Sequence, residues 1–303
     1  MSYFVQFLLL AGISVLGCVK VSLQGSMSRR YVRCTQDGVW FNGMLFAAIA
    51  CCMCLIFPLA KPDLSTVLHA AAAGVCVVLF QTCYALALAS GPVSLTTLIV
   101  NFSVLLVAGF GMAMYGDRLY ATQIAGIAAL VVSMFLSVEK KENEKKRQGR
   151  WLLLVLLAMT GDSGIGFVQR MFSVTPGAAT PHMDITFSAI MYVIASLLAF
   201  AFYFCNTRCG LRSKSSMGFD WHVLLYVAAI AAVLSVYQKG MMLSVANIEG
   251  TFLHPTHSGL MSLIMTAIGL LFFHDRLSSR QRWGVAFGIL CVVLMNVRLG
   301  PAV

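Results

Sequence analysis

Ten runs of about 20 predominantly apolar residues follow one another along the chain of 303 residues. A helix that crosses the hydrocarbon core of a bilayer needs about that length, because in lipid its backbone polar groups must be satisfied within the segment. Each run therefore predicts a membrane-spanning helix. The predicted spans are residues 3–21, 39–60, 65–90, 92–115, 119–138, 151–172, 184–204, 221–245, 251–273 and 279–297.

The composition excludes most soluble classes of protein. Hydrophobic residues make up 59% of the chain and charged residues 11%, and the mean hydropathy is +0.86. A globular domain carries roughly 25% charged residues, so this chain lacks the polar surface that water requires. Most of the ten cysteines lie in apolar runs, where a thiol acts as a small hydrophobe. We predict an integral, multi-pass membrane protein embedded in a lipid bilayer.

The net charge of +10 has a topological explanation. Of the 21 Lys and Arg residues, 15 lie in or beside the loops after the first, third, fifth, seventh and ninth runs, against four on the opposite side. This bias is typical of cytoplasmic loops and places the hydrophilic segment 139–150 in the cytoplasm, with the protein in the plasma (inner) membrane. The basic residues form no patch interleaved with aromatic residues, so we expect no nucleic-acid partner.

Two sequence patterns recur in the two halves of the chain. The segment 117–126 holds Asp-Arg-Leu, then Gln, then Gly, and this order returns in 275–284 at an offset of 158. Segments 12–20 and 161–169 share two glycines and a valine at an offset of 149. These matches indicate a duplicated unit of five helices.

The duplication predicts the architecture. Because five is an odd number, the two copies must cross the membrane upside down relative to each other, as in alternating-access transporters with a site near the midplane. The expected fold class is an all-α integral membrane protein, with ten transmembrane helices arranged as two inverted five-helix repeats around a central cavity. The expected domains are a first repeat 1–138, a charged cytoplasmic linker 139–150 and a second repeat 151–303.

Several motifs also resemble a known family. They are Tyr-Ala-Leu-Ala at 84–87, the sequence Gly-Pro-Val-Ser-Leu-Thr-Thr-Leu-Ile at 91–99, the two segments with the repeated Asp-Arg-Leu, and Gly-Thr-Phe-Leu-His-Pro at 250–255. In these the chain resembles EamA-like members of the drug/metabolite transporter superfamily, although Asp117 and Asp275 stand where the family usually has Glu. The resemblance implies a carrier of small metabolites or drugs, often an exporter (efflux), and it does not specify the substrate.

Three ionisable residues within spans are candidates for contact with the substrate, because a charge at membrane depth usually faces a cavity or a partner. Asp162 suits cation coupling or a substrate amine, or alternatively a structural ion pair. Lys20 and Lys239 suit an anionic group, although Lys20 lies near a span end and can snorkel. If all three face a cavity, the substrate is a zwitterion such as an amino acid.

Weaker candidates complete the predicted site, since buried amides often only bridge helices. Gln169 shares a helical face with Asp162, and His257 stands three residues after His254. The histidine pair lacks a third ligand, so we expect no metal, no cofactor and no catalytic residue. The predicted substrate-binding residues are Lys20, Gln81, Tyr84, Asn101, Asp162, Gln169, Lys239 and His257.

Other classes of membrane protein remain as alternatives. An integral-membrane enzyme needs a reactive cluster, and the histidine pair is the one candidate. A receptor or channel shares the composition but does not need inverted halves. No Walker motif is present, which disfavours an ATP-driven pump. Gly284 and Gly288 form a G-x-x-x-G pattern that packs helices within a chain or allows a homodimer through the last helix.

Overall fold

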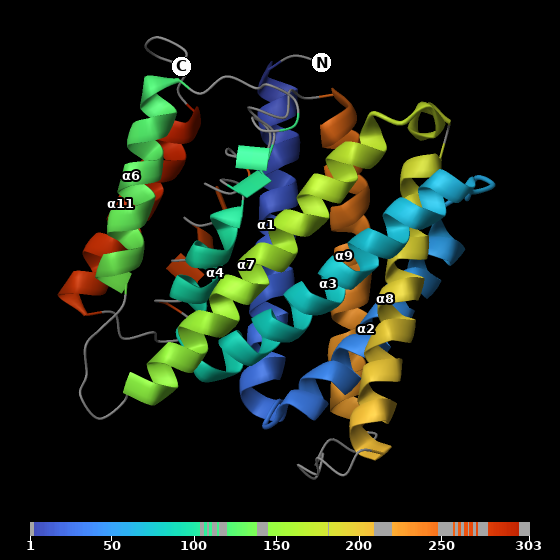
Figure 1. Ribbon diagram of the computed structural model, residues 1–303, viewed down its shortest axis with the longest axis horizontal. Helices are drawn as coiled ribbons and strands as arrows, with labels where there is room; N and C mark the ends of the chain where they lie inside the picture. Colours follow the sequence, from blue (N-terminus) through green and yellow to red (C-terminus); the bar gives the residue numbers. More distant parts are fainter. Residues whose placement is uncertain are drawn as a thin grey trace. The chain divides into compact units, whose positions relative to one another are not determined.

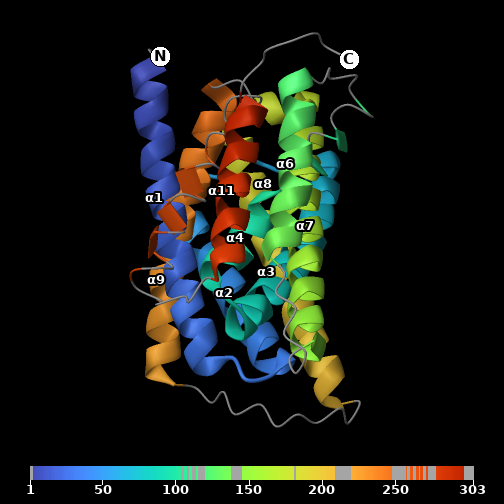
Figure 2. The ribbon, with the colours of Figure 1, turned by 90° about the vertical axis from the view of Figure 1, so that its left-hand side faces the viewer.

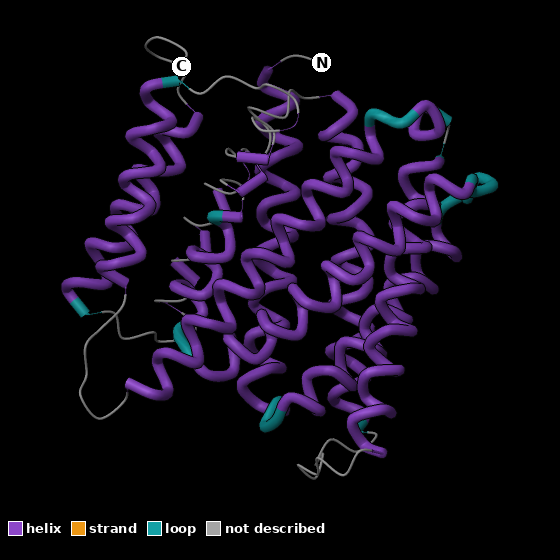
Figure 3. The backbone as a smooth tube through the Cα atoms, viewed as in Figure 1, coloured by secondary structure: helices purple, strands orange, loops and turns teal. Residues whose placement is uncertain are grey.

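The computed structural model describes residues 3–103, 120–137, 145–180, 182–208, 220–247 and 278–296 without a break, and some residues within 106–114 and 257–271. The regular structure of these residues is helical (Figure 3), in agreement with the predicted all-α class. The elements are α1 (Tyr3–Tyr31), α2 (Thr35–Ile56), α3 (Leu64–Ser90), α4 (Val93–Asn101), α6 (Ala121–Ser137), α7 (Lys145–Ser173), η2 (Pro176–Ala179), α8 (Met183–Arg208), α9 (Trp221–Asn247) and α11 (Ser279–Asn296).

Six of the described helices are long and apolar enough to cross a membrane. These spans are Leu8–Tyr31, Thr35–Ile56, Leu64–Ser90, Gly149–Ser173, Met183–Cys205 and Trp221–Met241. Large apolar side chains such as Leu55 and Leu68 are exposed on them, as expected for surfaces that contact lipid. Helices α6 and α11 lie within the predicted spans 119–138 and 279–297, whereas 92–115 and 251–273 fall largely outside the described residues. The count of ten therefore stays a prediction.

Three helix boundaries differ from the predicted spans. Helix α1 continues to Tyr31 instead of ending near residue 21, and its polar residues Gln24 and Ser28 are buried, with Gln24 hydrogen-bonded to Gln81 of α3. Helix α2 ends at Ile56, and Phe57 adopts an extended conformation with φ −120° and ψ 144°. Pro58 follows Phe57, and proline disfavours the helical conformation of the residue before it. Helix α7 begins at Lys145, so the second half of segment 139–150 is helical.

Contact clustering divides the chain into two compact units, each built from both halves of the sequence. Unit 1 comprises Met1–Cys18, Gly91–Met159 and Gly240–Val303, and unit 2 comprises Val19–Ser90 and Thr160–Lys239.

Unit 2 is organised around α8, which packs against both α2 and α3 (Figure 1). Its core contains buried aromatic and aliphatic side chains, including Phe187, which stacks on Phe172 at a centroid distance of 4.4 Å. The Ser196 hydroxyl donates to the Gly43 carbonyl at 3.0 Å. A Cβ atom at Gly43 would lie 2.9 Å from the Phe200 ring, so glycine allows this close approach of α2 to α8.

In unit 1, α6 packs along α11 (Figure 2). The Ser133 hydroxyl of α6 donates to the Gly284 carbonyl of α11 at 2.7 Å, which places the small-residue face of α11 against a helix of the same chain. A homodimer through α11 stays a prediction. At the start of α4, the Trp151 indole N–H donates to the Thr96 hydroxyl at 3.0 Å. A Cβ at Gly91 would overlap that indole ring.

The first turn of α3 is capped by Asp63, which directly precedes the helix. Its carboxylate accepts the Thr66 backbone N–H at 2.8 Å and also accepts the Thr66 hydroxyl. Both hydrogen bonds lower the pKa of Asp63 below its ordinary value of 3.8, and the bond from the Thr66 hydroxyl has the larger effect. A carboxylate at this position satisfies an otherwise unpaired N–H and interacts favourably with the helix dipole.

Asp63→Ala is expected to lower the melting temperature of the purified protein by about 2–4 °C at neutral pH. Since the folded-state pKa is depressed, the contribution of the carboxylate is present above pH 3.8 and is lost as the pH falls through the folded pKa below it. Asp63→Asn, which also caps, should keep most of the stability. Melting of the alanine variant at the wild-type temperature at neutral pH would show that the cap contributes nothing.

Candidate functional site

A stripe of buried polar side chains runs along α1 in unit 2. Lys20, Gln24 and Ser28 stand four residues apart, so they lie on one helical face. Lys20 is 7% exposed, and Gln24 and Ser28 are 0% exposed. Polar groups buried at membrane depth are costly and usually serve a site or a partner. We call these three residues the α1 polar stripe.

Helix α3 supplies the partners of the stripe. The Gln24 side-chain amide N–H donates to Gln81 Oε1 at 2.8 Å. The Lys20 Nζ atom lies 5.6 Å from the centroid of the Phe80 ring and 5.6 Å from that of Tyr84. An ammonium over aromatic faces gains a cation–π attraction that grows when water is excluded. The structure thus brings together three residues of the predicted site, Lys20, Gln81 and Tyr84.

Two polar atoms of the stripe have no hydrogen-bond partner among the described residues. They are the Gln24 Oε1 atom and the Ser28 hydroxyl oxygen. A buried acceptor that forms no hydrogen bond costs about 1–3 kcal/mol, so such atoms favour a ligand or water that donates to them. The sequence analysis missed Gln24 and Ser28, although their four-residue spacing from Lys20 was a usable signal.

Helix α7 approaches α3 closely beside the stripe. A Cβ at Gly161 would lie 2.7 Å from the Phe80 backbone nitrogen, and one at Gly164 would lie 2.7 Å from the Cys76 sulfur. Small residues at a helix interface allow such proximity. Asp162 follows Gly161 directly, is half-buried, and is near enough to Lys20 for the two opposite charges to interact. The stripe and its neighbours on α3 and α7 therefore combine a cation, a carboxylate and neutral amides.

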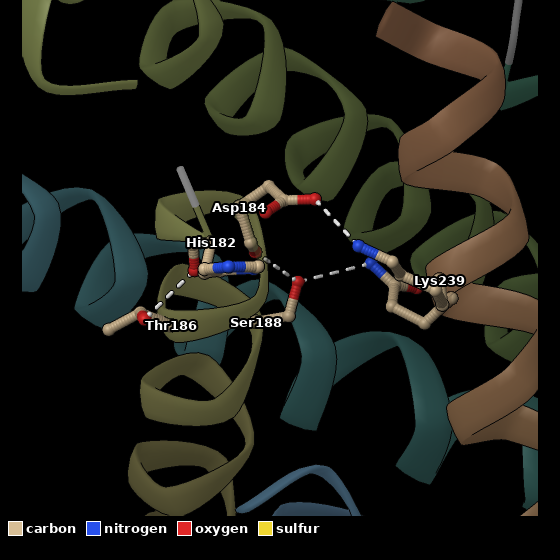
Figure 4. Close-up of polar contacts among 6 residues, drawn as sticks. His182, Asp184, Thr186, Ser188 and Lys239 are labelled. Atoms are coloured by element: carbon tan, nitrogen blue, oxygen red, sulfur yellow. Dashed lines mark hydrogen bonds and ion pairs between the residues drawn. The ribbon is translucent and has the colours of Figure 1, made fainter. Parts of the chain in front are cut away.

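Lys239 of α9 lies in a different polar cluster, beside residues at the start of α8 (Figure 4). Its Nζ atom is 3.9 Å from Asp184 Oδ2, with side chains 29% and 36% exposed, and 5.9 Å from the centroid of the Phe57 ring. The preceding Gln238 donates from its amide to the Ser188 hydroxyl at 3.5 Å. The structure gives Lys239 an acidic partner that the sequence analysis did not anticipate, and such half-exposed ion pairs contribute little to stability.

The remaining predicted residues are placed separately. Gln169 is half-buried farther along α7 in unit 2. Asn101 is the last residue of α4 in unit 1, and its side chain lies outside the described part. His257, also in unit 1, is buried, and its Nδ1 atom is 2.9 Å from the Ser14 hydroxyl oxygen.

The length and apolar composition of six described helices are those of an integral, multi-pass membrane protein. Residues 7–139 match the EamA-like transporter family. This match confirms the resemblance to the drug/metabolite transporter superfamily over α1 to α6, a segment that includes Lys20, Gln81 and Tyr84. It indicates a membrane transporter of the drug/metabolite type and favours a transporter over an enzyme.

Comparison with other known proteins gives information about the fold only. None of the curated proteins compared matches the chain. A crystal structure of a protein matches with a TM-score of 0.60 and 13% sequence identity, covering 94% of this chain and 97% of its own. At this level of identity the likeness shows that the same fold extends over nearly the whole chain.

Proposed function

We propose that the protein is a secondary carrier that moves a small zwitterionic metabolite, of the amino-acid class, by alternating access between two inverted five-helix repeats. Residues 1–138 and 151–303 form the repeats and 139–150 is the cytoplasmic linker. The observation that carries the proposal is the α1 polar stripe, with a buried ammonium at Lys20 and an unpaired acceptor on Gln24.

Helix packing supports the inverted repeat. By their order in the two halves, α2 corresponds to α8 and α6 to α11, and both pairs pack together. At the 149-residue offset of the first pattern, residues 19–90 correspond to 168–239, and the two segments of unit 2 are 19–90 and 160–239. Contacts between corresponding elements are what a pseudo-symmetric duplication produces.

The charges of Lys20 and Asp162 support the class of substrate. A carboxylate of the substrate would pair with Lys20, and its ammonium would donate to Gln24 Oε1 and face Asp162. Such a ligand gives the orphaned acceptor a donor and neutralises both protein charges, which lowers the cost of burying them. A simple cation leaves Lys20 unmatched, and a simple anion leaves the Gln24 acceptor unmatched.

The proposed direction of transport and the proposed location of the protein in the cell rest on weaker observations. The excess of Lys and Arg in the loops after odd-numbered spans, segment 139–150 included, favours a plasma-membrane orientation with that segment in the cytoplasm. The family resemblance favours export. Without a nucleotide-binding motif in the sequence, transport is coupled to an ion gradient, to exchange of substrates, or to neither, as in a uniporter.

A ligand panel on the purified protein tests the class of substrate. Matched compounds should include an amino acid, the carboxylic acid that lacks its amine, the amine that lacks its carboxylate, a nucleoside and a cationic drug. A ligand that binds only the folded state raises the melting temperature, by about 5 °C at a hundredfold excess over Kd. We expect amino acids to raise the melting temperature of the protein and both truncated analogues to leave it unchanged. A shift with nucleosides or cationic drugs alone contradicts a zwitterionic substrate.

A further inference from the structure

A second cluster of reactive side chains lies in unit 1. Helix α1 contributes Ser14 and Cys18, one turn apart, and the segment 257–265 contributes His257, Met261 and Met265 at four-residue spacing. All five side chains are buried. The cluster contains a thiol, thioethers and an imidazole, which are three kinds of soft or borderline metal ligand.

Two contacts join the segments. The Cys18 sulfur lies 3.5 Å from the Met261 sulfur, and the Ser14 hydroxyl oxygen lies 2.9 Å from His257 Nδ1. With metal–sulfur distances of about 2.3 Å, two sulfur atoms at this separation can bind one ion. Ser14 and Cys18 are one helical turn apart, as are His257 and Met261, so the two contacts lie on neighbouring turns of the same pair of segments.

The hydrogen bonds of the Ser14 hydroxyl favour one tautomer of His257. When the hydroxyl donates to the Leu10 carbonyl oxygen, 2.8 Å away, it accepts from His257, and Nδ1 then carries the proton. The lone pair of the imidazole is then on Nε2, the nitrogen that commonly ligates metals while the other nitrogen is held by an outer hydrogen bond.

We propose that Cys18, Met261 and His257 form a binding site for a soft monovalent metal ion of the Cu⁺ class. The Cys18 thiol releases its proton to solvent as the ion binds, so Cu⁺ and the thiolate form a neutral unit and no electron is transferred. Thiolate and thioether ligands select Cu⁺. A divalent ion such as Zn²⁺ would leave a net positive charge in an apolar interior, which is expensive.

This site differs from the expectation drawn from sequence. The His254–His257 spacing gave no metal site because no third ligand stands near it in the sequence. The structure brings Cys18, more than 200 residues away, against Met261 one turn from His257. The proposed ion binds one of these histidines together with sulfur ligands, and it does not depend on the transport proposal.

Titration of the reduced, full-length protein with Cu⁺ against a competing Cu⁺ chelator tests the site, with Ag⁺ as a redox-inert probe. We expect the wild-type protein to bind one Cu⁺ ion tightly. The affinity for this ion should fall about 100-fold in Cys18→Ser and at least about 10-fold in Met261→Leu. Cys291→Ser is the matched control, because Cys291 is also a buried thiol of unit 1. X-ray absorption of the Cu⁺ form should show both sulfur and nitrogen ligands.

The variants keep the exposed Cys51 and Cys54, so weak binding to surface thiols is common to all of them and cancels in the comparison. Wild-type affinity in both Cys18→Ser and Met261→Leu would overturn the proposal, as would loss of the tight equivalent in Cys291→Ser. If Cys18→Ser does not elute as a folded protein, Met261→Leu decides alone, since leucine replaces methionine at nearly constant volume.

Discussion

Lys20→Met is expected to abolish the ligand-dependent rise in melting temperature and to weaken binding of the substrate by about 100-fold. Removal of one partner from a buried charge pair commonly costs about 2–5 kcal/mol of binding free energy. Lys20 is buried beside Phe80 and Tyr84, so no water replaces its ammonium. The binding constant comes from calorimetry or from the ligand dependence of the melt.

Two further measurements make this result specific. Without ligand, the Lys20→Met protein should still fold and should melt within a few degrees of the wild type, because the loss of the interaction with Asp162 opposes the gain from no longer burying an ammonium. Lys61→Met, the same change in the exposed loop before α3, should leave binding unchanged. Unaltered binding in Lys20→Met would remove the lysine from the substrate site.

Gly161→Leu is expected to have the largest effect on folding. A Cβ atom at this position would lie 2.7 Å from the backbone nitrogen of Phe80, and backbone atoms cannot rotate away as the end of a side chain can. Overpacking of this kind costs about 3 kcal/mol, which corresponds to a fall of roughly 6–12 °C in melting temperature. The displacement also moves Asp162 away from Lys20, so ligand binding should weaken as well.

Gly12→Leu is the matched control, because Gly12 corresponds to Gly161 at the 149-residue offset. Among the described residues, none has an atom within 4 Å of a Cβ at Gly12, so a leucine there should be accepted and should slightly favour the helix. Equal melting temperatures of the two leucine variants would mean that α7 does not depend on this close contact with α3.

The sequence was most informative where apolar runs are long. Helix α3 (Leu64–Ser90) was expected at 65–90 and α9 (Trp221–Asn247) at 221–245, because length and hydropathy alone define a span. The predicted first span stopped too early, since the residues after Lys20 look like a loop when their burial is unknown. The helix continues past Lys20, and Gln24 within it donates a hydrogen bond to Gln81, which is 57 residues away in the sequence.

The site was only partly predictable for the same reason. Lys20, Gln81, Tyr84 and Asp162 were identified as polar residues within apolar runs, a signal that needs no knowledge of the fold. The partners were not identified, because the contacts of Lys239 with Asp184 and of His257 with Ser14 join segments distant in sequence. Hydropathy reports how deep a residue lies in the membrane and does not report which helices pack against each other.

Counterflow in proteoliposomes tests the carrier mechanism most directly. Vesicles that hold the wild-type protein are loaded with an unlabelled amino acid that shifts the melt, and they are diluted into a trace of the labelled compound. An alternating-access carrier exchanges the two, so we expect the labelled compound to rise transiently above its equilibrium level inside, and this overshoot to vanish in Lys20→Met. Uptake that reaches equilibrium at the same rate with or without internal substrate, and without overshoot, would indicate a channel and would contradict the proposed mechanism.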